Sequence, residues 1–197
     1  KGRRWASPEG GLWMSVVLKP GKPDPRLVFV GALAVVDVLG ELGVEAWVKW
    51  PNDVWVGRRK IAGILTEAKG EEFVVMGIGL NVNNPLPGEL KGKATSIKVL
   101  TGRETPLEDV IKSLLRHLDL WYAVFLRDPG KVVREVRERM PILGKAVEVV
   151  TGEERFSGEA ADLLPDGSLL LKTKEGVRRV LQGDVSLRLG STNELKN

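Results

Sequence analysis

The stretch from position 44 to position 65 constrains the fold most, because a proline and polar turn residues interrupt three short apolar runs. Trp50 precedes Pro51, and a residue before proline is biased towards extended backbone. Asn52 and Asp53 follow, and both residue types favour turns. The pattern predicts three consecutive strands over 44–50, 53–57 and 60–67.

Charged residues of this stretch gather where its strands meet. Lys49 lies near the end of the first strand, Asp53 opens the second and Lys60 opens the third, so both signs of charge are expected at one rim of a sheet. Gly63 has no side chain, and a glycine within a strand often marks a close approach by a ligand or another backbone. From the residues alone, a ligand-binding rim and a basic hairpin with a solvated tip both stay open.

The flanking segments predict helices on a sheet. A buried strand is expected over 12–18, and apolar residues at helical spacing predict a helix over 25–42 that ends at Gly43. With a further strand over 71–79, the N-terminal part is expected to be an α+β unit, a mixed sheet backed by helices. The loop over 81–94 is long enough to suggest a binding role.

Two more helices are predicted after this loop. Thr105 begins a capping-box pattern with proline at the first helical position, which predicts a helix that runs to about Arg127. His117 lies on this helix among charged neighbours, so an exposed or partly packed histidine is expected rather than a catalytic one. A short, highly charged helix with a solvated face is expected over 130–139.

The pattern changes after Leu143, where short apolar runs alternate with turns. Asp166-Gly167 between two apolar runs is a strong hairpin signal. A small barrel is expected, with strands over 145–150, 155–161, 168–172 and 177–181.

Composition excludes several classes of function. The 197 residues contain no cysteine and one histidine, which excludes disulfides, thiolate catalysis and a histidine-rich metal site. The 30 basic and 26 acidic residues give a net charge of +4, too weak a bias for a nucleic-acid-binding surface. No apolar run reaches the roughly 18 residues of a membrane span, and no signal peptide opens the sequence, so a cytoplasmic protein is expected.

Four strings in a fixed order resemble the biotin protein ligases, or biotin–[acetyl-CoA-carboxylase] ligases. The first is GRRWASPEGG at positions 2–11, and the second is KWPNDV at 49–54 with RRKIAGIL at 58–65. The others are GIGLNVN at 77–83 and GDVSLR at 183–188. Together these strings span nearly the whole chain.

This resemblance implies a fold and a reaction. The fold is a catalytic domain like that of class II synthetases over 1–141 and an SH3-like domain over 142–189, without the DNA-binding domain that makes some relatives repressors. The reaction joins biotin to a lysine of a biotin carboxyl carrier protein of the acetyl-CoA or pyruvate carboxylase type. ATP and Mg²⁺ are the implied cofactors: biotin first gives biotinyl-5′-AMP and pyrophosphate, and the carrier lysine then displaces AMP.

The resemblance also implies roles for individual residues. Lys60 matches the family's central lysine between the biotin carboxylate and the α-phosphate, and a compact ammonium suits that place. Asp53 matches an aspartate close to the acyl phosphate, which would help with metal or accept the proton of the incoming lysine. Contacts with biotin or biotinyl-AMP are implied for Arg3, Trp5, Gly10, Gly11, Lys60, Ile61, Gly63, Ile64, Ser191, Thr192 and Asn193. Contacts with ATP or phosphate are implied for Trp50, Asn52, Asp53, Gly77, Gly79, Asn81, Thr95 and Ser96, and contacts with Mg²⁺ for Asn81 and Asp53.

Two features depart from the family's order. The sequence begins inside the family's arginine–glycine loop, so a preceding strand and a biotin-contacting glutamine would lie outside it. The tail over 190–197 contains Ser191-Thr192-Asn193, which resembles the family's N-terminal biotin-contacting segment. A permuted chain, pieces of a longer protein in a new order, and chance stay open as explanations.

Two other functions stay open as well. A lipoate or octanoyl ligase or transferase shares the catalytic fold, although the KWPND and W-x-SPxGG strings favour biotin. A non-catalytic module that binds biotin or the carrier would keep the pocket without the reaction. A homodimer is compatible with the ligase, and neither nucleic acid nor a membrane is expected as a partner.

Overall fold

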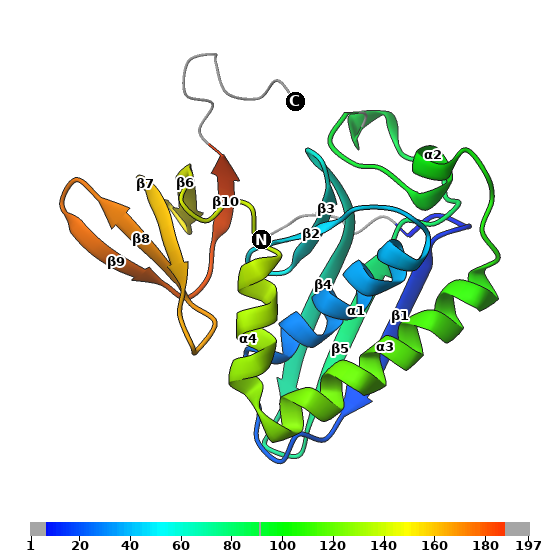
Figure 1. Cartoon of the computed structure of the whole chain (residues 1–197), viewed down its shortest axis with the longest axis horizontal. Coiled ribbons are helices and arrows are strands. Elements are labelled where there is room, and N and C mark those ends of the chain that lie inside the picture. Colours follow the sequence, from blue (N-terminus) through cyan, green and yellow to red (C-terminus); the bar gives the residue numbers. More distant parts are fainter. Residues whose placement is uncertain (1–6, 91, 188–197) are drawn as a thin grey trace.

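The structure is a computed structural model of the chain and describes residues 7–90 and 92–187. It contains two antiparallel sheets, the first backed by helices and the second built of strands alone (Figure 1). None of the helices within the described residues is both long and apolar enough to cross a membrane.

The first sheet has five strands in the order β1-β5-β4-β3-β2, and all neighbouring strands are antiparallel. Its strands are β1 (Leu12–Leu18), β2 (Trp47–Lys49), β3 (Asp53–Val56), β4 (Arg59–Lys69) and β5 (Phe73–Leu80). The expected α+β architecture is confirmed, and the three strands predicted from the 44–65 stretch are neighbours in this sheet. The described strands are all antiparallel where a mixed sheet was expected, because short turns join β2, β3, β4 and β5 in succession.

Helix α1 (Leu27–Glu41) covers one face of the first sheet (Figure 1). Ile64 on β4 and Met76 on β5 point at this helix and are buried. At the contact lies Gly31, where an added Cβ would come within 2.9 Å of Met76 Sδ and 3.0 Å of Ile64 Cγ2. The absence of a side chain therefore lets α1 lie close to the sheet.

Helix α3 (Leu107–Arg127) packs alongside α1 (Figure 1). Most residues of α1 are buried because it packs against the sheet and against both α3 and the later helix over 129–138. His117 on α3 has a side chain that is 15% exposed, with Nε2 3.0 Å from Glu41 Oε1 and Nδ1 3.6 Å from Asp37 Oδ2. The expected packed histidine is confirmed, and it is held by two carboxylates of α1.

The start of α3 differs from the expectation. Pro106 is the N-cap and makes no side-chain cap, so the predicted capping box is wrong. The physical reason is that the backbone N–H of Thr105 donates to Asn83 Oδ1 at 3.0 Å. The remaining helical segments are η1 (Gly88–Leu90), α2 (Ile97–Thr101) and α4 (Pro129–Glu138).

The second sheet has five strands in the order β10-β6-β7-β8-β9. They are β6 (Ala146–Thr151), β7 (Glu154–Leu163), β8 (Leu169–Thr173), β9 (Gly176–Val180) and β10 (Asp184–Leu187). Asp166-Gly167 forms the turn between β7 and β8, as its residue types predict. Because β9 and β10 are the two edges of the sheet, closure into an SH3-like barrel stays a prediction.

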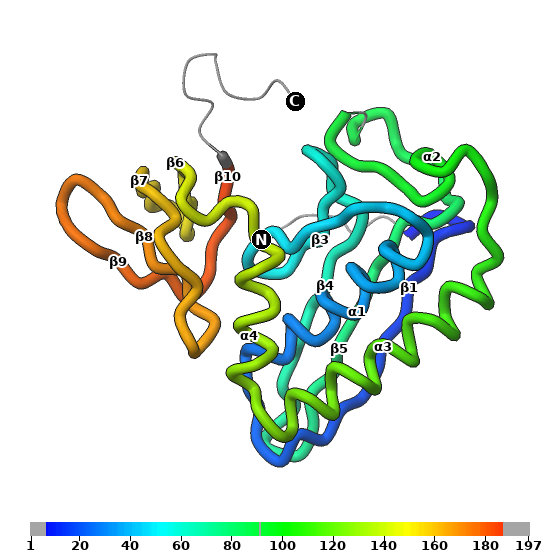
Figure 2. The backbone as a smooth tube through the Cα atoms, in the orientation of Figure 1, coloured from blue at the N-terminus to red at the C-terminus, as the bar shows by residue number. Residues whose placement is uncertain are grey.

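The two sheets are joined by more than the chain between them. The turn between β7 and β8 lies beside the start of α1 (Figure 2) and accepts hydrogen bonds from Arg26 and Trp50. Arg137 on α4 also pairs with Asp162 on β7 at 2.8 Å.

Candidate functional site

One transverse row of residues crosses all five strands of the first sheet. Strand by strand, it runs through Trp13, Gly79, Gly63, Asp53 and Lys49. Residues opposite one another share a face of the sheet, and these lie on the face turned away from α1 because the alternate residues point at the helix. Two adjacent glycines, both buried, therefore leave a stretch of the sheet without side chains, here called the glycine trough, between the indole of Trp13 and the carboxylate of Asp53.

A β-bulge brings Lys60 to the same face. Lys60 precedes Gly63 by three positions, and in a regular strand this odd spacing would put the two residues on opposite faces. The β3–β4 register shifts between Val54 and Trp55, so that Lys60 lies opposite Trp55. Lys60 Nζ then reaches Asp53 Oδ1 at 2.5 Å. Bulges often re-aim a side chain in this way next to active sites.

The Lys60–Asp53 pair is partly covered but reachable from solvent, with side chains 36% and 19% exposed. The backbone of Lys60 is also fixed by the segment over 93–95. Its N–H donates to Lys93 O and its carbonyl accepts from Thr95 N, both at 2.9 Å. The backbone is thus held in place while the ammonium sits on a flexible four-carbon stem. Such a group can follow negative charge as it develops on a ligand.

Asn52 fastens the polar turn to β4. Its Nδ2 donates to Ile64 O at 2.8 Å, and its own carbonyl accepts from Ile64 N at 2.8 Å. The family resemblance implies a contact between Asn52 and ATP, which stays a prediction, and in the structure this side chain positions the backbone that leads into Asp53.

Asparagines hold the segment after β5 against the bulge. Asn81 N donates to Ile61 O at 2.9 Å, and Asn81 Nδ2 donates to Thr95 O at 3.0 Å. Asn84 Nδ2 donates to Asn81 Oδ1 at 3.1 Å, and Asn84 Oδ1 accepts from Val82 N at 3.0 Å. Both ends of the Asn81 amide are therefore engaged by the protein.

Gly10 and Gly11 pack on this asparagine segment and on Trp13. Gly10 has φ +90°, and a Cβ there would lie 3.0 Å from Asn84 N. A Cβ on Gly11 would lie 2.3 Å from Trp13 Cζ2. Close packing thus accounts for both glycines. The sequence patterns do not single out Trp13 or Asn84, because Trp13 sits in an ordinary apolar run and only the register with Gly79 distinguishes it.

Three residues expected at the nucleotide are buried instead. Trp50, Thr95 and Ser96 are 1%, 0% and 1% exposed. Trp50 Nε1 donates to Gly167 O at 2.9 Å, and Ser96 Oγ accepts from Val99 N at 3.3 Å as the N-cap of α2. Direct contacts between these side chains and a nucleotide are not supported by these positions.

The other expected residues divide between the two faces of the sheet. Gly63, Gly77 and Gly79 lie on the face turned away from α1, where Gly63 and Gly79 are buried and Gly77 is partly buried, and their ligand contacts stay predictions. Ile61 is 0% exposed, and Ile64 is 1% exposed and packs towards α1. The expectation that the Ile64 side chain lines a biotin channel is therefore not supported. The remaining expected contacts lie outside the described residues and stay predictions: Arg3, Trp5, Ser191, Thr192 and Asn193.

The magnesium expectation can be tested against the donor atoms present. Within residues 7–90 and 92–187, no three Asp, Glu, His or Cys side chains are arranged to hold a metal ion. Mg²⁺ commonly takes one or two protein carboxylates together with phosphate oxygens and water. Asp53 offers such a carboxylate beside the trough, whereas the Asn81 oxygen already accepts from Asn84. Asp53 thus fits a magnesium ion that arrives on ATP, whereas the Asn81 oxygen has one acceptor position left, and both residues stay predicted ligands.

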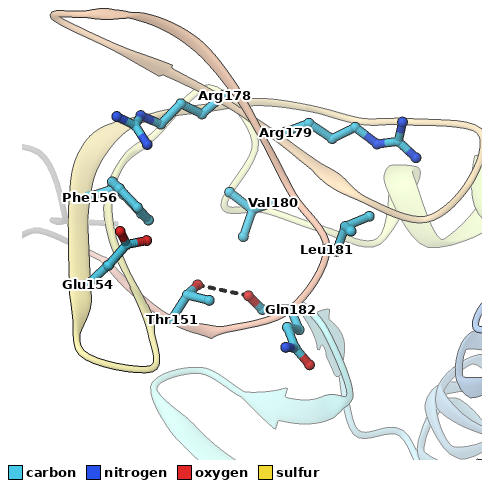
Figure 3. Close-up of a pocket in the computed structure, with 8 residues that line it drawn as sticks. All are labelled: Thr151, Glu154, Phe156, Arg178, Arg179, Val180, Leu181 and Gln182. Carbon is cyan, nitrogen blue, oxygen red and sulfur yellow. Dashed lines mark hydrogen bonds between the residues drawn. The ribbon is translucent and has the colours of Figure 1, made fainter.

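A separate hollow of about 390 Å³ lies on the second sheet (Figure 3). Its lining residues all belong to positions 151–182. The guanidinium of Arg178 stacks on Phe156, 4.5 Å from the ring centre, and Thr151 Oγ1 donates to Gln182 O at 2.9 Å. This hollow is distinct from the candidate site, which is the Lys60–Asp53 pair and the glycine trough.

The described residues thus form a helix-backed antiparallel sheet that carries a lysine–carboxylate pair, followed by a small all-β unit, and the class of protein with both parts is given by two family matches. Residues 1–83 match the Biotin/lipoate A/B protein ligase family, and residues 142–188 match the Biotin protein ligase C terminal domain. The chain belongs to the biotin protein ligase family.

Similar proteins and structures agree with this assignment. The chain is 30% identical to the biotin–[acetyl-CoA-carboxylase] ligase of Paracoccus denitrificans, over 89% of the chain and 80% of the relative. It is 31% identical to the Mycobacterium tuberculosis ligase of the same name, over 93% of the chain and 72% of the relative. The biotin protein ligase from Aquifex aeolicus in complex with biotin and ATP superposes with a TM-score of 0.85 at 32% identity, covering 95% of this chain and 82% of that one.

A longer relative is the bifunctional ligase/repressor BirA of Bacillus subtilis. It is 34% identical over 94% of the chain, but the chain spans only 61% of that relative's length.

Proposed function

We propose that this chain is an ATP-dependent biotin–protein ligase that attaches biotin to a lysine of a biotin carboxyl carrier protein through biotinyl-5′-AMP. The observation that carries the proposal is the Lys60–Asp53 pair, 2.5 Å apart beside the Gly63–Gly79 trough, in a chain of this family. The ligases of Paracoccus and Mycobacterium, named for acetyl-CoA carboxylase, support a carboxylase carrier as the acceptor.

In the first step, a carboxylate oxygen of biotin attacks the α-phosphorus of ATP. The bond from that phosphorus to the bridging oxygen of the β-phosphate breaks, and pyrophosphate leaves with the electron pair. Both reactants are anions, so catalysis consists mainly of offsetting their repulsion and holding them in line. The ammonium of Lys60 lies beside the trough and supplies positive charge to both groups. Mg²⁺ bound to ATP would offset charge on the leaving pyrophosphate.

The glycine trough gives biotin a place to lie. With no side chain at Gly63 or Gly79, the flat ring system can rest on the backbone of β4 and β5. The indole of Trp13 closes one side of the trough, and Lys60 stands on the other, where the carboxylate is expected. The length of biotin would thus be aligned across the strands.

In the second step, the neutral amine of the carrier lysine attacks the acyl carbon of biotinyl-AMP. The bond between that carbon and the phosphate oxygen breaks, AMP leaves, and the amine loses a proton. Asp53, beside Lys60, is the carboxylate suited to accept this proton. The same carboxylate is the proposed ligand of Mg²⁺ in the first step.

The division of the chain is part of the proposal. We assign the chemistry to positions 1–141 and a supporting role to positions 142–189, with 190–197 as a tail that resembles the family's biotin-contacting segment. The two family matches, over 1–83 and 142–188, support this division. A cytoplasmic location and a homodimer stay predictions.

A lipoate or octanoyl ligase is the second candidate, because the first family match covers biotin and lipoate ligases together. Pyrophosphate release in the presence of ATP and either biotin, lipoate or octanoate separates the two. Release only with biotin supports the proposal, and release only with lipoate or octanoate contradicts it. Calorimetric binding of biotin without pyrophosphate release would instead indicate a non-catalytic module.

A further inference from the structure

The turn between β7 and β8, residues 164–168, is fastened to the unit that carries the candidate site. Trp50 Nε1 donates to Gly167 O at 2.9 Å across 117 positions of sequence, and Trp50 is 1% exposed. A buried indole N–H normally needs a hydrogen-bond partner, and here the partner comes from the second sheet.

Two further contacts hold the same turn. Arg26, next to the start of α1, donates from Nη1 to Pro165 O at 3.1 Å, and its guanidinium is oriented by a 2.6 Å ion pair with Asp24. Gly167 has φ +84°, and a Cβ there would lie 2.9 Å from Phe29 Cε2. The turn therefore fits against α1 only with glycine at this position.

Contacts within the second sheet also stabilise the 164–168 turn. Asp166 Oδ1 accepts from Ser168 N at 3.1 Å and from Ser168 Oγ at 2.6 Å. Arg179 on β9 pairs with Asp166 and donates from Nε to Ser168 Oγ at 2.9 Å. Because β9 fixes the 164–168 turn on one side, the turn can hold Trp50 in place on its other side.

Trp50 lies two positions before the Asn52–Asp53 turn of the candidate site. Trp50 follows β2 and lies three positions before Asp53, whose partner across the β2–β3 pair is Lys49. Between Trp50 and Asp53, Asn52 is fastened to β4. The polar turn is thus held at its far end by β4 and at its near end by Trp50.

We propose that the 164–168 turn is a positioning element for the Asn52–Asp53 turn, acting through the Trp50–Gly167 hydrogen bond. The inference rests on the proposed ligase function for its kinetic consequence, but its structural part stands independently. The second sheet would then contribute to formation of biotinyl-AMP, and not only to recognition of the carrier. Trp50 and Gly167 are positioning residues, because they act on Asp53 and not on a substrate.

The variants Trp50→Phe and Gly167→Ala test this proposal. The first removes the N–H and keeps most of the aromatic body, and the second drives a methyl group into Phe29. Gly152→Ala is the matched control, since Gly152 also has positive φ (+62°) in a hairpin turn of the second sheet but an added Cβ meets nothing within 4 Å. The readouts are kcat and KM for biotinyl-AMP formation, the melting temperature, and amide hydrogen exchange over residues 48–56.

We expect both test variants to lower kcat about tenfold or more with KM for biotin and ATP little changed, because misplacing a catalytic group by about 1 Å is costly while the trough is intact. Exchange over 48–56 should become several-fold faster in both, and Gly152→Ala should change neither. Unchanged exchange over 48–56 in both test variants would overturn the proposal, as would equal losses of kcat in the test variants and the control. If the wild type makes no biotinyl-AMP, the ligase proposal fails, and hydrogen exchange alone still decides the positioning claim.

Discussion

Lys60 and Asp53 meet across the β3–β4 pair, with Nζ 2.5 Å from Oδ1, because a bulge in the pairing turns Lys60 to the face that carries Asp53. Seven positions separate them in sequence. The sequence predicts both residues at one rim of the sheet, but it does not show that they form a pair. The pair is thus a product of strand register.

A first prediction concerns the shape of the cation at position 60. Lys60→Arg should lower the rate of biotinyl-AMP formation by about 10² or more, because a planar guanidinium cannot take the place of a compact ammonium between two anions. Single-turnover adenylation measures this. A Lys60→Arg enzyme within a few-fold of the wild-type rate would show that charge alone suffices.

Stability should be almost unaffected by the same change. The Lys60–Asp53 pair is partly exposed, and such pairs contribute at most about 1 kcal/mol. Urea unfolding of Lys60→Arg should therefore match the wild type closely, so that a loss of rate is not a loss of fold.

A second prediction tests whether a ligand passes over Gly77. An added Cβ there meets only Leu65 O, at 3.9 Å, so the sheet has room for alanine. Gly77→Ala should leave the melting temperature unchanged or slightly raised, and should raise KM for ATP about tenfold, equivalent to about 1.4 kcal/mol. An unchanged KM in a folded variant would remove Gly77 from the phosphate site.

A third prediction concerns the contact between α1 and the sheet. Gly31→Val should destabilise the protein by about 2 kcal/mol, because the added atoms collide with Met76 and Ile64. Gly40→Val on the same helix is the control, since an added Cβ at Gly40 meets nothing within 4 Å. Chemical denaturation compares the two. Helix propensity favours valine over glycine at both sites, so an equal loss of stability in Gly40→Val would mean that the collision with Met76 and Ile64 is not its cause.

A fourth prediction concerns pH. Burial raises the pKa of Asp24, but hydrogen bonds from the Arg26 side chain and backbone outweigh it and leave the pKa of that carboxyl below its ordinary value. A lowered pKa in the folded state means that the ionised carboxyl stabilises the fold above about pH 4, and that this stabilisation is lost as the pH falls through the folded pKa.

Asp24→Asn should therefore reduce the free energy of unfolding at pH 6–7, by about 1 kcal/mol or less. The difference from wild type should shrink as the pH falls below about 4. Unfolding curves measured from pH 3 to pH 7 check this. A difference that stays constant over the range would mean that the Asp24 charge is not the source of the stabilisation.

Much of the fold follows from local patterns in the sequence. Helical spacing between Leu27 and Glu41 predicts α1, and the proline and polar turn at 51–53 predict the break between β2 and β3. Asp166-Gly167 predicts the β7–β8 hairpin. These features depend on residues close together in sequence, where backbone preferences are directly expressed.

The features that could not be predicted depend on distant contacts. The capping box at Thr105 fails because the backbone N–H of Thr105 donates to Asn83. Trp50 can be buried because its indole N–H donates a hydrogen bond to the carbonyl of Gly167, 117 positions away. The trough requires Gly63 and Gly79 to be opposite one another, which a sequence alone does not reveal. The family resemblance names both members of the Lys60–Asp53 pair, and the site roles that it implies stay predictions. It does not separate Gly63, on the face turned away from α1, from Ile64, which packs against α1.

The most direct test of the ligase proposal is to measure biotinyl-5′-AMP and pyrophosphate formed from biotin and ATP. The wild type should release one pyrophosphate for each biotinyl-AMP, and Lys60→Ala should lower that rate by about 10² or more. Lys69→Ala is the control, because Lys69 lies at the exposed end of the same strand, 3.7 Å from Glu67, and should behave as wild type. No biotin-dependent pyrophosphate from the wild type, or a near wild-type rate from Lys60→Ala, would contradict the account.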